Sequence, residues 1–429
     1  MTRSESGTTG KATPDFPGPL QRTQPAIGRK IRGKSHPADT AIGALAAVLA
    51  VSNLVQGIWT PDVPWLDLTF ATLLLSLPIT FALIVRGGSR GGLGAFLVLC
   101  ISIAFGYFSP ALNPFASDKR ISIVITVAYI TLFAVLALTN QRRLRAFFIT
   151  LVGAALVVAI AQAFLADPGM LALGRRTPEG LNAIGAARAL GAGVVVTLAS
   201  AASLQSRKHV RRALLLAIPL VAALILTASR GPLLGVLGAG AVIVWGMPKL
   251  MKSGKVVFTA VLGVAGYLAY GQLSASGSRL VDYADSGRGH LYDSALDIGV
   301  RHPMGIGWGN FYNYIDPSLV SSDQGYNQYP HNVLLEFLAE AGWASATLLI
   351  LYLLIVARSA LLVRHIPGGL ALICLAVFSF ISASLSSDVI GNRLAWVCLA
   401  AILGFQSAQS RRGVDSGARI WSGAGPAAS

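Results

Sequence analysis

Three residues in the second half of the chain have side chains suited to a transfer reaction: Arg230 in TASRGP, Arg288 in SGRGHLYDSALDIG and His331 in QYPHNVLLEFLAEAGW. A guanidinium can bind the paired oxygens of a phosphate, and two guanidiniums on one face would suit a pyrophosphate group. A histidine, whose ordinary pKa is about 6.5, can accept the proton of a hydroxyl group. The three residues therefore indicate a site that holds an anionic group and activates a hydroxyl.

Each of these residues also has a purely structural interpretation. Arg230 lies at the joint of two apolar runs, where an arginine can extend to the membrane surface. Arg288 can form the polar edge of an amphipathic helix on that surface, and His331 or Asn332 can cap the helix that follows. The expected apolar stripe of the amphipathic helix comprises Leu291, Ala295, Leu296 and Val300. The residues alone leave both interpretations open.

Further polar residues are candidates for contacts with a substrate. This substrate-binding set comprises Arg175, Arg176, Asn182, Arg301 and Asn332. For Asn182, which precedes a predicted helix in GRRTPEGLNAIGAARAL, capping of the helix is the favoured role. Glu336 and Glu340 lie one and two turns into the helix after His331, close to its positive end. Either carboxylate can orient the imidazole.

The polar stretch between positions 282 and 302 is rich in acidic residues and histidine. It holds Asp282, Asp285, His290, Asp293, Asp297 and His302. Their spacing matches no metal motif, so we expect solvated loop residues, and neither a metal nor a cofactor. The following HPMGIGWGNF lacks the frame of a dinucleotide fingerprint and the Lys-Ser/Thr of a phosphate loop. We expect a glycine turn at the membrane surface, with Trp308 as an interfacial anchor.

The composition places these residues in a membrane protein. Hydrophobic residues make up 54% of the 429 residues and charged residues 12%, and the mean hydropathy is +0.64. A soluble globular protein carries about twice that charged fraction. The net charge of +16 comes mostly from short links between apolar runs, so it indicates membrane topology rather than nucleic-acid binding. The three cysteines lie in apolar runs and predict no disulfide framework.

Apolar windows of about 20 residues predict an all-α integral membrane protein with about twelve transmembrane helices. The windows are 40–58, 66–85, 92–108, 121–139, 146–165, 182–204, 212–228, 232–248, 256–273, 332–357, 368–386 and 391–408. We expect residues 1–39 to form a disordered tail, 40–408 a polytopic membrane domain and 409–429 a second tail. Residues 274–331, between the ninth and tenth helices, would be the external catalytic loop. The first tail lacks the apolar core of a signal peptide, so the first helix is expected to be an uncleaved anchor.

The distribution of Lys and Arg predicts the orientation. Of the 34 such residues, ten fall on the side of the membrane that holds 274–331, which leaves 24 on the side that holds the tails. The ten are Lys119, Arg120, Arg175, Arg176, Arg188, Arg230, Arg279, Arg288, Arg301 and Arg393. The positive-inside rule then places both termini in the cytoplasm and the 274–331 loop outside. Arginines on the outside are not explained by topology, which makes them the stronger functional candidates.

Taken together, the motifs resemble those of the O-antigen ligase and polymerase superfamily. One span ends in TASRGP, an arginine opens the long outer loop, P-x-G-x-G-x-x-x-F forms a turn, and HN-x-x-L-x-x-x-x-E-x-G opens the next helix. The resemblance covers about residues 215–345. By position, the two arginines of the superfamily are Arg230 and Arg288 here, and its histidine is His331.

The resemblance implies a metal-independent, inverting membrane glycosyltransferase of the C type in the bacterial cytoplasmic membrane, with its site facing outward. Such enzymes move a glycan from undecaprenyl diphosphate to a hydroxyl on a glycan or lipid acceptor, as in lipopolysaccharide biosynthesis. The arginines would engage the diphosphate and the histidine would activate the acceptor. An O-antigen ligase and a repeat-unit polymerase of the same superfamily both fit.

Two other classes of protein have a similar layout. A flippase for lipid-linked oligosaccharides often has twelve spans with both ends inside, but transporters place polar residues near the membrane midplane. The centres of the predicted spans are almost free of charge, and Arg188, the exception, falls close to the outer surface. A scaffold of an envelope complex would keep glycan transfer intact when the outer arginines are changed.

Overall fold

The computed structural model describes residues 37–59, 67–87, 90–172, 175–203, 207–246, 259–260, 263, 288–316 and 328–421. The chain divides into Met1–His36, which lies outside these ranges, and Pro37–Ser429. Most of the predicted 256–273 span and much of the 274–331 loop also lie outside the described residues.

The described elements are helical apart from one isolated bridge between Ala166 and Pro178. The longer helices are α1 (Pro37–Trp59), α2 (Leu68–Val85), α3 (Arg90–Ala104), α6 (Gln141–Phe164), α8 (Ala183–Ser203), α9 (Arg207–Leu226), α10 (Arg230–Gly246), α12 (Arg288–Arg301), α14 (Gly342–Val363), α15 (Gly369–Leu385) and α16 (Arg393–Trp421). The shorter ones are α4 (Pro114–Ile123), α5 (Ile130–Ala137), α7 (Pro168–Ala172) and α13 (Val333–Glu336). Wider π turns follow α4 at Val124–Tyr129 and α13 at Phe337–Ala341.

Six of the described helical segments are long and apolar enough to cross a membrane. They are Pro37–Leu54, Leu68–Val85, Pro114–Ala137, Gln141–Phe164, Ala183–Ser203 and Val333–Val363. Gly92–Tyr107, Arg230–Val244 and Gly369–Leu385 are shorter apolar helices. Every predicted window except 256–273 coincides with a described helix, which confirms an all-helical membrane protein. Twelve spans and an inward position of both termini stay predictions.

Side-chain caps begin several of these helices. The Asp67 carboxylate accepts hydrogen bonds from Thr69 N and Phe70 N at the start of α2. Asn113 accepts one from Ala116 N at the start of α4, where Pro114 occupies the first helical position. Such caps satisfy backbone N–H groups that have no partner within the helix. The Asn113-Pro114 pair thus fixes the first residue of the helix that carries Lys119.

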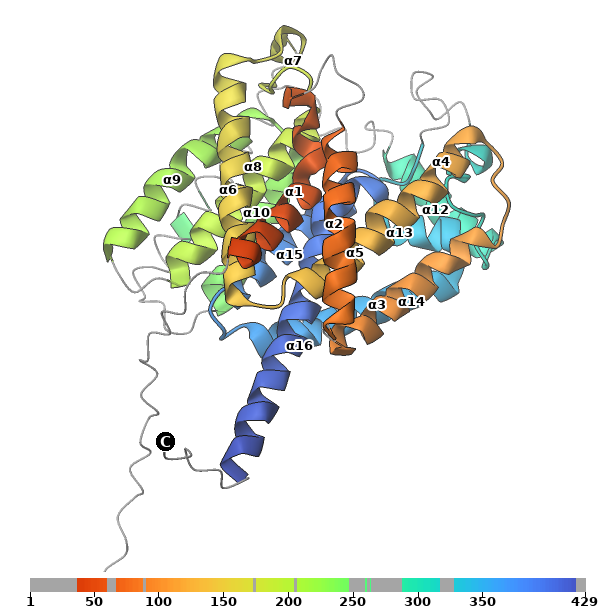
Figure 1. Ribbon diagram of the computed structural model, residues 1–429. Helices are drawn as coiled ribbons and strands as arrows, with labels where there is room; N and C mark the ends of the chain where they lie inside the picture. Colours follow the sequence, from red (N-terminus) through yellow and green to blue (C-terminus); the bar gives the residue numbers. More distant parts are fainter. Residues whose placement is uncertain are drawn as a thin grey trace, which may run out of the picture. The chain divides into compact units, whose positions relative to one another are not determined.

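Most of the described helices pack around one large apolar core that extends from Ala46 in α1 to Phe405 in α16. The helix α8 packs against α6, α9 and α15, and α1 lies along α6 (Figure 1). The last helix, α16, packs against α5 and α14, and α14 lies against α3. In α8 nearly every residue is buried, from Ala183 to Ala201. Arg188 is therefore carried on a helix that is enclosed by others.

Small residues allow α10 and α15 to approach closely. A Cβ atom on Gly235 would lie 2.6 Å from the carbonyl oxygen of Phe378, and one on Gly231 would lie 3.3 Å from Ser386 Oγ. Gly238 likewise abuts the side chain of Ile381. Glycine at a helix interface lets the two backbones meet without a side chain between them. This contact sets the position of Arg230, the first residue of α10.

We expect Gly235→Ala to destabilise the protein by about 1–3 kcal/mol, because the added methyl must push α10 away from Phe378. The measurement is thermal unfolding in detergent. Gly94→Ala in α3 is the matched control, since a Cβ there meets nothing within 4 Å and alanine favours helix by up to about 1 kcal/mol. Equal unfolding temperatures for the two variants would contradict the close contact.

The helical segment that follows His331 is broken in the middle. Asn332 caps α13, the chain then widens into the π turn Phe337–Ala341, and Gly342 takes a φ of 84° before α14 begins. The glycine turn of HPMGIGWGNF docks into this break: Ile306 N donates to Ala339 O, Gly307 N to Glu340 O, and Trp343 N to Pro303 O. The two sequence motifs thus form one structural unit.

Positive φ angles explain the glycines of this unit. Gly305, Gly307 and Gly309 have φ values of 83°, 91° and 81°, a region that other residues rarely adopt. A Cβ on Gly305 would also lie 2.6 Å from the Glu340 carbonyl oxygen. The turn is therefore confirmed, and its glycines are required both by their backbone angles and by the close approach of the broken helix.

The structure corrects two predictions about side chains near this unit. Trp308 is not an interfacial anchor: it is fully buried, donates from Nε1 to Ile103 O, and meets Phe337 edge-on. In α12 the predicted apolar stripe divides between two faces. Leu291, Ala295 and Ile298 are buried, whereas Leu296 and Val300 are 48% and 73% exposed. The reason is helical geometry, because positions 291, 295 and 298 share a face from which 296 and 300 are rotated.

Candidate active site

A buried ionic cluster lies where α4 meets the broken helix. Lys119 Nζ is 2.6 Å from Glu336 Oε1 and 2.7 Å from Glu340 Oε2, and all three side chains are fully buried. The Lys119 ammonium also lies 5.8 Å from the ring centre of Phe115 and 6.0 Å from that of Trp308. Burying charges is costly unless each is paired and hydrogen-bonded. Such a cluster persists only where its geometry is fixed by the surrounding structure.

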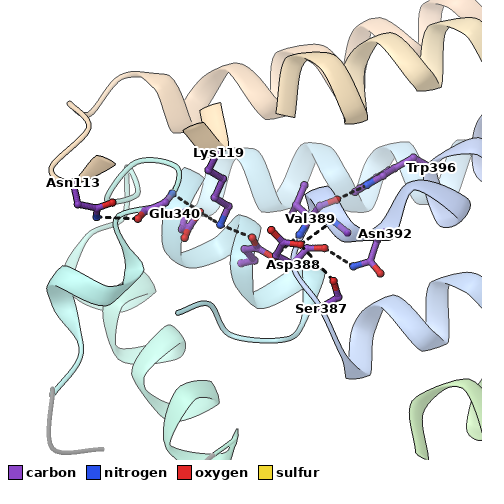
Figure 2. Close-up of polar contacts among 11 residues, drawn as sticks. Asn113, Lys119, Glu340, Ser387, Asp388, Val389, Asn392 and Trp396 are labelled. Carbon is purple, nitrogen blue, oxygen red and sulfur yellow. Dashed lines mark hydrogen bonds and ion pairs between the residues drawn. The ribbon is translucent and has the colours of Figure 1, made fainter. Parts of the chain in front are cut away.

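Each carboxylate of the cluster also holds a backbone amide of a different segment. Val389 N donates to Glu336 Oε2, and Gly309 N donates to Glu340 Oε2, both at 2.9 Å. Figure 2 shows these contacts running from Asn113 past Glu340 and Lys119 to Val389. The cluster therefore connects four segments: α4, the glycine turn, the broken helix with α13 and its π turn, and the link between α15 and α16.

The link between α15 and α16 is itself held by hydrogen bonds. Asp388 Oδ1 accepts from Gly391 N at 2.8 Å, and Asn392 Nδ2 donates to the Asp388 carbonyl. Trp396 Nε1 donates to Val389 O, as Figure 2 shows. Ser387 has a φ of 71°, which a non-glycine residue rarely adopts. The Asp388 carboxylate is thus presented at a tightly fixed turn.

Arg188 fastens α8 to the same link. Its guanidinium donates to the carbonyl oxygens of Ser382, Ser386 and Gly391 and to Ser386 Oγ, at distances from 2.5 to 3.2 Å. The side chain lines a small cavity with room for about one water molecule. Carbonyl oxygens at a helix end carry partial negative charge. They balance part of the buried positive charge of Arg188.

His331 lies at a constrained position beside this polar centre. Its φ is 56°, in the left-handed region, and its ring lies 4.4 Å from that of Tyr329, centre to centre. Burial, together with the negative charges of Asp388 and Glu336, raises the pKa of Tyr329 to about 12 against the opposing effects of Lys119 and Arg188. Tyr329 is therefore protonated at neutral pH. Helix α13, which begins two residues after His331, contacts α15 and carries Glu336 of the buried cluster.

Arg230 lies close to the α15–α16 link, at the start of α10. It is half-buried at the first position of α10, and a Cβ on its neighbour Gly231 would lie 3.3 Å from Ser386 Oγ. Arg188 binds the same Ser386. Both arginines therefore belong to segments that meet at the turn after α15. Arg188 and Arg230 thus both lie near Ser386 of the α15–α16 link, two residues before Asp388.

The remaining candidates have more varied surroundings. Arg176 donates from Nε to Gln162 O and from its backbone N to Leu226 O, which places its loop beside the end of α9. Arg175, on the same loop, is half-buried. Asn182 accepts a hydrogen bond from Ile184 N, and Asn332 accepts from Leu334 N and Leu335 N. Both asparagines therefore cap helices, the structural role weighed from the sequence.

The two arginines of α12 lie at opposite ends of that helix. Arg288 is its first residue, and its side chain lies outside the described residues. Arg301 is its last residue, 72% exposed, and pairs with Asp297 at 2.9 Å. A helix of this length separates its ends by about 20 Å. One small ligand group therefore cannot contact both arginines.

Sequence reasoning did not place Lys119 or Asp388 in the site, and it named Arg188 only as one of the arginines on the predicted outer side. Lys119 lies within the candidate span Pro114–Ala137, and Glu336 and Glu340 within Val333–Val363, each nearer to the start of its segment than to the centre. The spacing of Glu336 and Glu340, four positions apart on one helix face, was the available signal. Ionisable residues inside a membrane segment are functional candidates and call for a partner, which here is Lys119.

These features define an all-helical membrane protein with a buried polar centre between its broken helix and the α15–α16 link. Residues 213–350 match the family described as O-antigen ligase. The match confirms the resemblance to the O-antigen ligase and polymerase superfamily and implies a bacterial membrane protein acting on lipid-linked glycans. No curated protein matches the chain. Lys119, Arg188 and Asp388 lie outside the matched segment.

Proposed function

We propose that this protein transfers a glycan from undecaprenyl diphosphate to an acceptor hydroxyl at the outer face of the bacterial cytoplasmic membrane. The match to the O-antigen ligase family carries this proposal, because the matched segment holds Arg230, Arg288 and His331 together. The position of Arg230 beside the α15–α16 link, whose Val389 N donates to Glu336 in the helix that follows His331, supports it. A glycan or lipid acceptor fits equally well.

In the proposed reaction His331 is the general base. It takes the proton of the acceptor hydroxyl as the acceptor oxygen bonds to the anomeric carbon, and the bond from that carbon to the diphosphate breaks. The electron pair leaves with the diphosphate, and Arg230 and Arg288 stabilise the charge that grows there. Attack opposite the leaving group inverts the anomeric centre. No metal or other cofactor takes part in this proposal.

The other predicted contacts are proposed to bind the sugar or the carrier head group. Arg175 and Arg176 lie on the loop beside the end of α9, and α10 starts four residues beyond Leu226. Asn182 and Asn332 cap helices through their side-chain oxygens, and their side-chain NH2 groups are proposed to donate to an oxygen of the sugar or the phosphate. Arg301 has an exposed guanidinium, which suits a contact at the rim of the site.

A repeat-unit polymerase of the same superfamily is the alternative that uses the same residues. The buried Lys119, Glu336 and Glu340 would favour a transporter if they lined a pathway. Their contacts favour a structural role instead, because both carboxylates are paired with Lys119 and with fixed backbone amides. A transferase therefore remains the better explanation of the site.

The test compares Arg230→Ala with Arg211→Ala in the native host. The two arginines lie at opposite ends of the α9–α10 hairpin, and Arg211 is exposed. We expect Arg230→Ala to lose surface glycan at normal membrane abundance, and Arg211→Ala to keep it. Accumulated long carrier-linked chains would identify a ligase, and accumulated single repeats a polymerase. Normal surface glycan in the Arg230 variant would contradict its role.

A further inference from the structure

The buried cluster has an asymmetry between its two carboxylates. Both contact Lys119 at nearly the same distance, 2.6 Å for Glu336 and 2.7 Å for Glu340. Their second contacts differ: Glu340 holds Gly309 of the glycine turn, whereas Glu336 holds Val389 of the α15–α16 link. The two glutamates therefore connect the same lysine to two different parts of the molecule.

Glu336 also lies in the first turn of α13, a helix that begins directly after His331 and the capping residue Asn332. Asn332 accepts hydrogen bonds from Leu334 N and Leu335 N, so the cap and Glu336 belong to one rigid turn. His331 precedes the cap and has a left-handed φ of 56°, a conformation that persists only where the surroundings impose it. Any rotation of α13 would move His331 with it.

The Val389 amide ties that turn to the segment that borders Arg230. Val389 lies three residues after Ser386, which abuts Gly231 at the start of α10. The connection therefore runs from Lys119 through Glu336 to Val389, and along the link to the residue after Arg230. Charge-assisted contacts of this kind are short and directional, and they hold their partners more firmly than neutral ones.

We propose that Lys119, acting through Glu336, is a positioning residue that sets the place of His331 relative to Arg230. The proposal rests on the proposed transfer reaction, in which one of these side chains handles the acceptor proton and the other the leaving diphosphate. General-base catalysis depends on placing the base within hydrogen-bonding reach of the reacting hydroxyl, and a misplacement of about 1 Å can cost about 100-fold in rate.

The test uses Glu336→Gln, which keeps the shape and an acceptor for Val389 N but removes the charge that attracts Lys119. Glu340→Gln removes the same charge from the same cluster and is the matched control. The full-length variants, purified in detergent, receive carrier-linked glycan and acceptor extracted from the host membrane. We expect Glu336→Gln to lower kcat about 10- to 100-fold with little change in the KM for the donor, and Glu340→Gln to have a much smaller effect.

A double-mutant cycle with His331→Ala separates positioning from general stability. If Glu336 acts through His331, its substitution has no further effect once the imidazole is gone, so the two losses are not additive. Additive losses, equal losses for the two glutamate variants, or an unchanged kcat for Glu336→Gln would each overturn the positioning role. Wild-type kcat in His331→Ala alone would instead overturn the proposed base.

A second measurement needs no turnover and keeps the two proposals distinguishable. The rate of diethylpyrocarbonate modification at each histidine reports its local exposure, and mass spectrometry resolves the sites. We expect Glu336→Gln to change the modification rate at His331 severalfold. The rate at His302, which follows α12 and packs against Tyr314, should be unchanged. An unchanged rate at His331 would overturn the positioning role whether or not the protein transfers glycans.

Discussion

Replacing His331 with alanine is expected to reduce glycan transfer by about 100- to 10,000-fold, the usual contribution of a general base. The acceptor hydroxyl would then have to lose its proton to water while it attacks the anomeric carbon. The measurement is transfer from a carrier-linked donor by the purified protein, with surface glycan in the host as the cellular counterpart. Binding of the donor should persist, because it is assigned to Arg230 and Arg288.

His302→Ala is the matched control for the loss of a histidine. Its ring packs edge-on against Tyr314, 5.1 Å away, just after α12, and we assign it no part in transfer. Equal abundance in the membrane is required for both variants, since the left-handed φ of His331 means that alanine is strained there. His331→Asn answers that concern, because asparagine tolerates this backbone region well. Normal transfer by His331→Asn would show that another group is the base.

Replacing Lys119 with alanine is expected to destabilise the protein by about 3–5 kcal/mol, the usual cost of removing one partner from a buried ion pair. Two fully buried carboxylates would lose their common cation, and the four segments that meet at the cluster would lose their connection. The measurement is thermal unfolding in detergent, followed by tryptophan fluorescence. Trp308 lies 6.0 Å from the ammonium and would report the change directly.

A neutral version of the cluster separates the cost of unpaired buried carboxylates from the loss of the connection between the segments. In Lys119→Met/Glu336→Gln/Glu340→Gln the uncompensated charges are gone, so most of the lost stability should return. Lys208→Ala, at an exposed position near the start of α9, controls for the loss of a lysine and should change stability by less than about 0.5 kcal/mol. If Lys119→Ala unfolds at the wild-type temperature, the cluster contributes nothing to the fold.

The sequence alone determined the class of protein and supplied the candidate residues for the proposed reaction. Hydropathy windows identify membrane helices because a span must be about 20 apolar residues long whatever it packs against. The glycine turn and the segment from His331 to Gly342 were recognisable because positive φ angles and helix caps restrict residue types locally. Arg230 and His331 were found for a related reason, since each stands at the border of an apolar run.

Only the tertiary structure decided which residues meet. Lys119 and Glu340 are 221 positions apart, and no local pattern predicts a pair formed when α4 packs beside the broken helix. The sequence placed Lys119 in a link outside the membrane and Trp308 at its surface, whereas folding buries both. Burial of α12 through Leu291, Ala295 and Ile298 is likewise set by the neighbouring glycine turn and π turn. The burial of a side chain and its ion-pair partner depend on which distant segments pack together, and this is decided only when the chain folds.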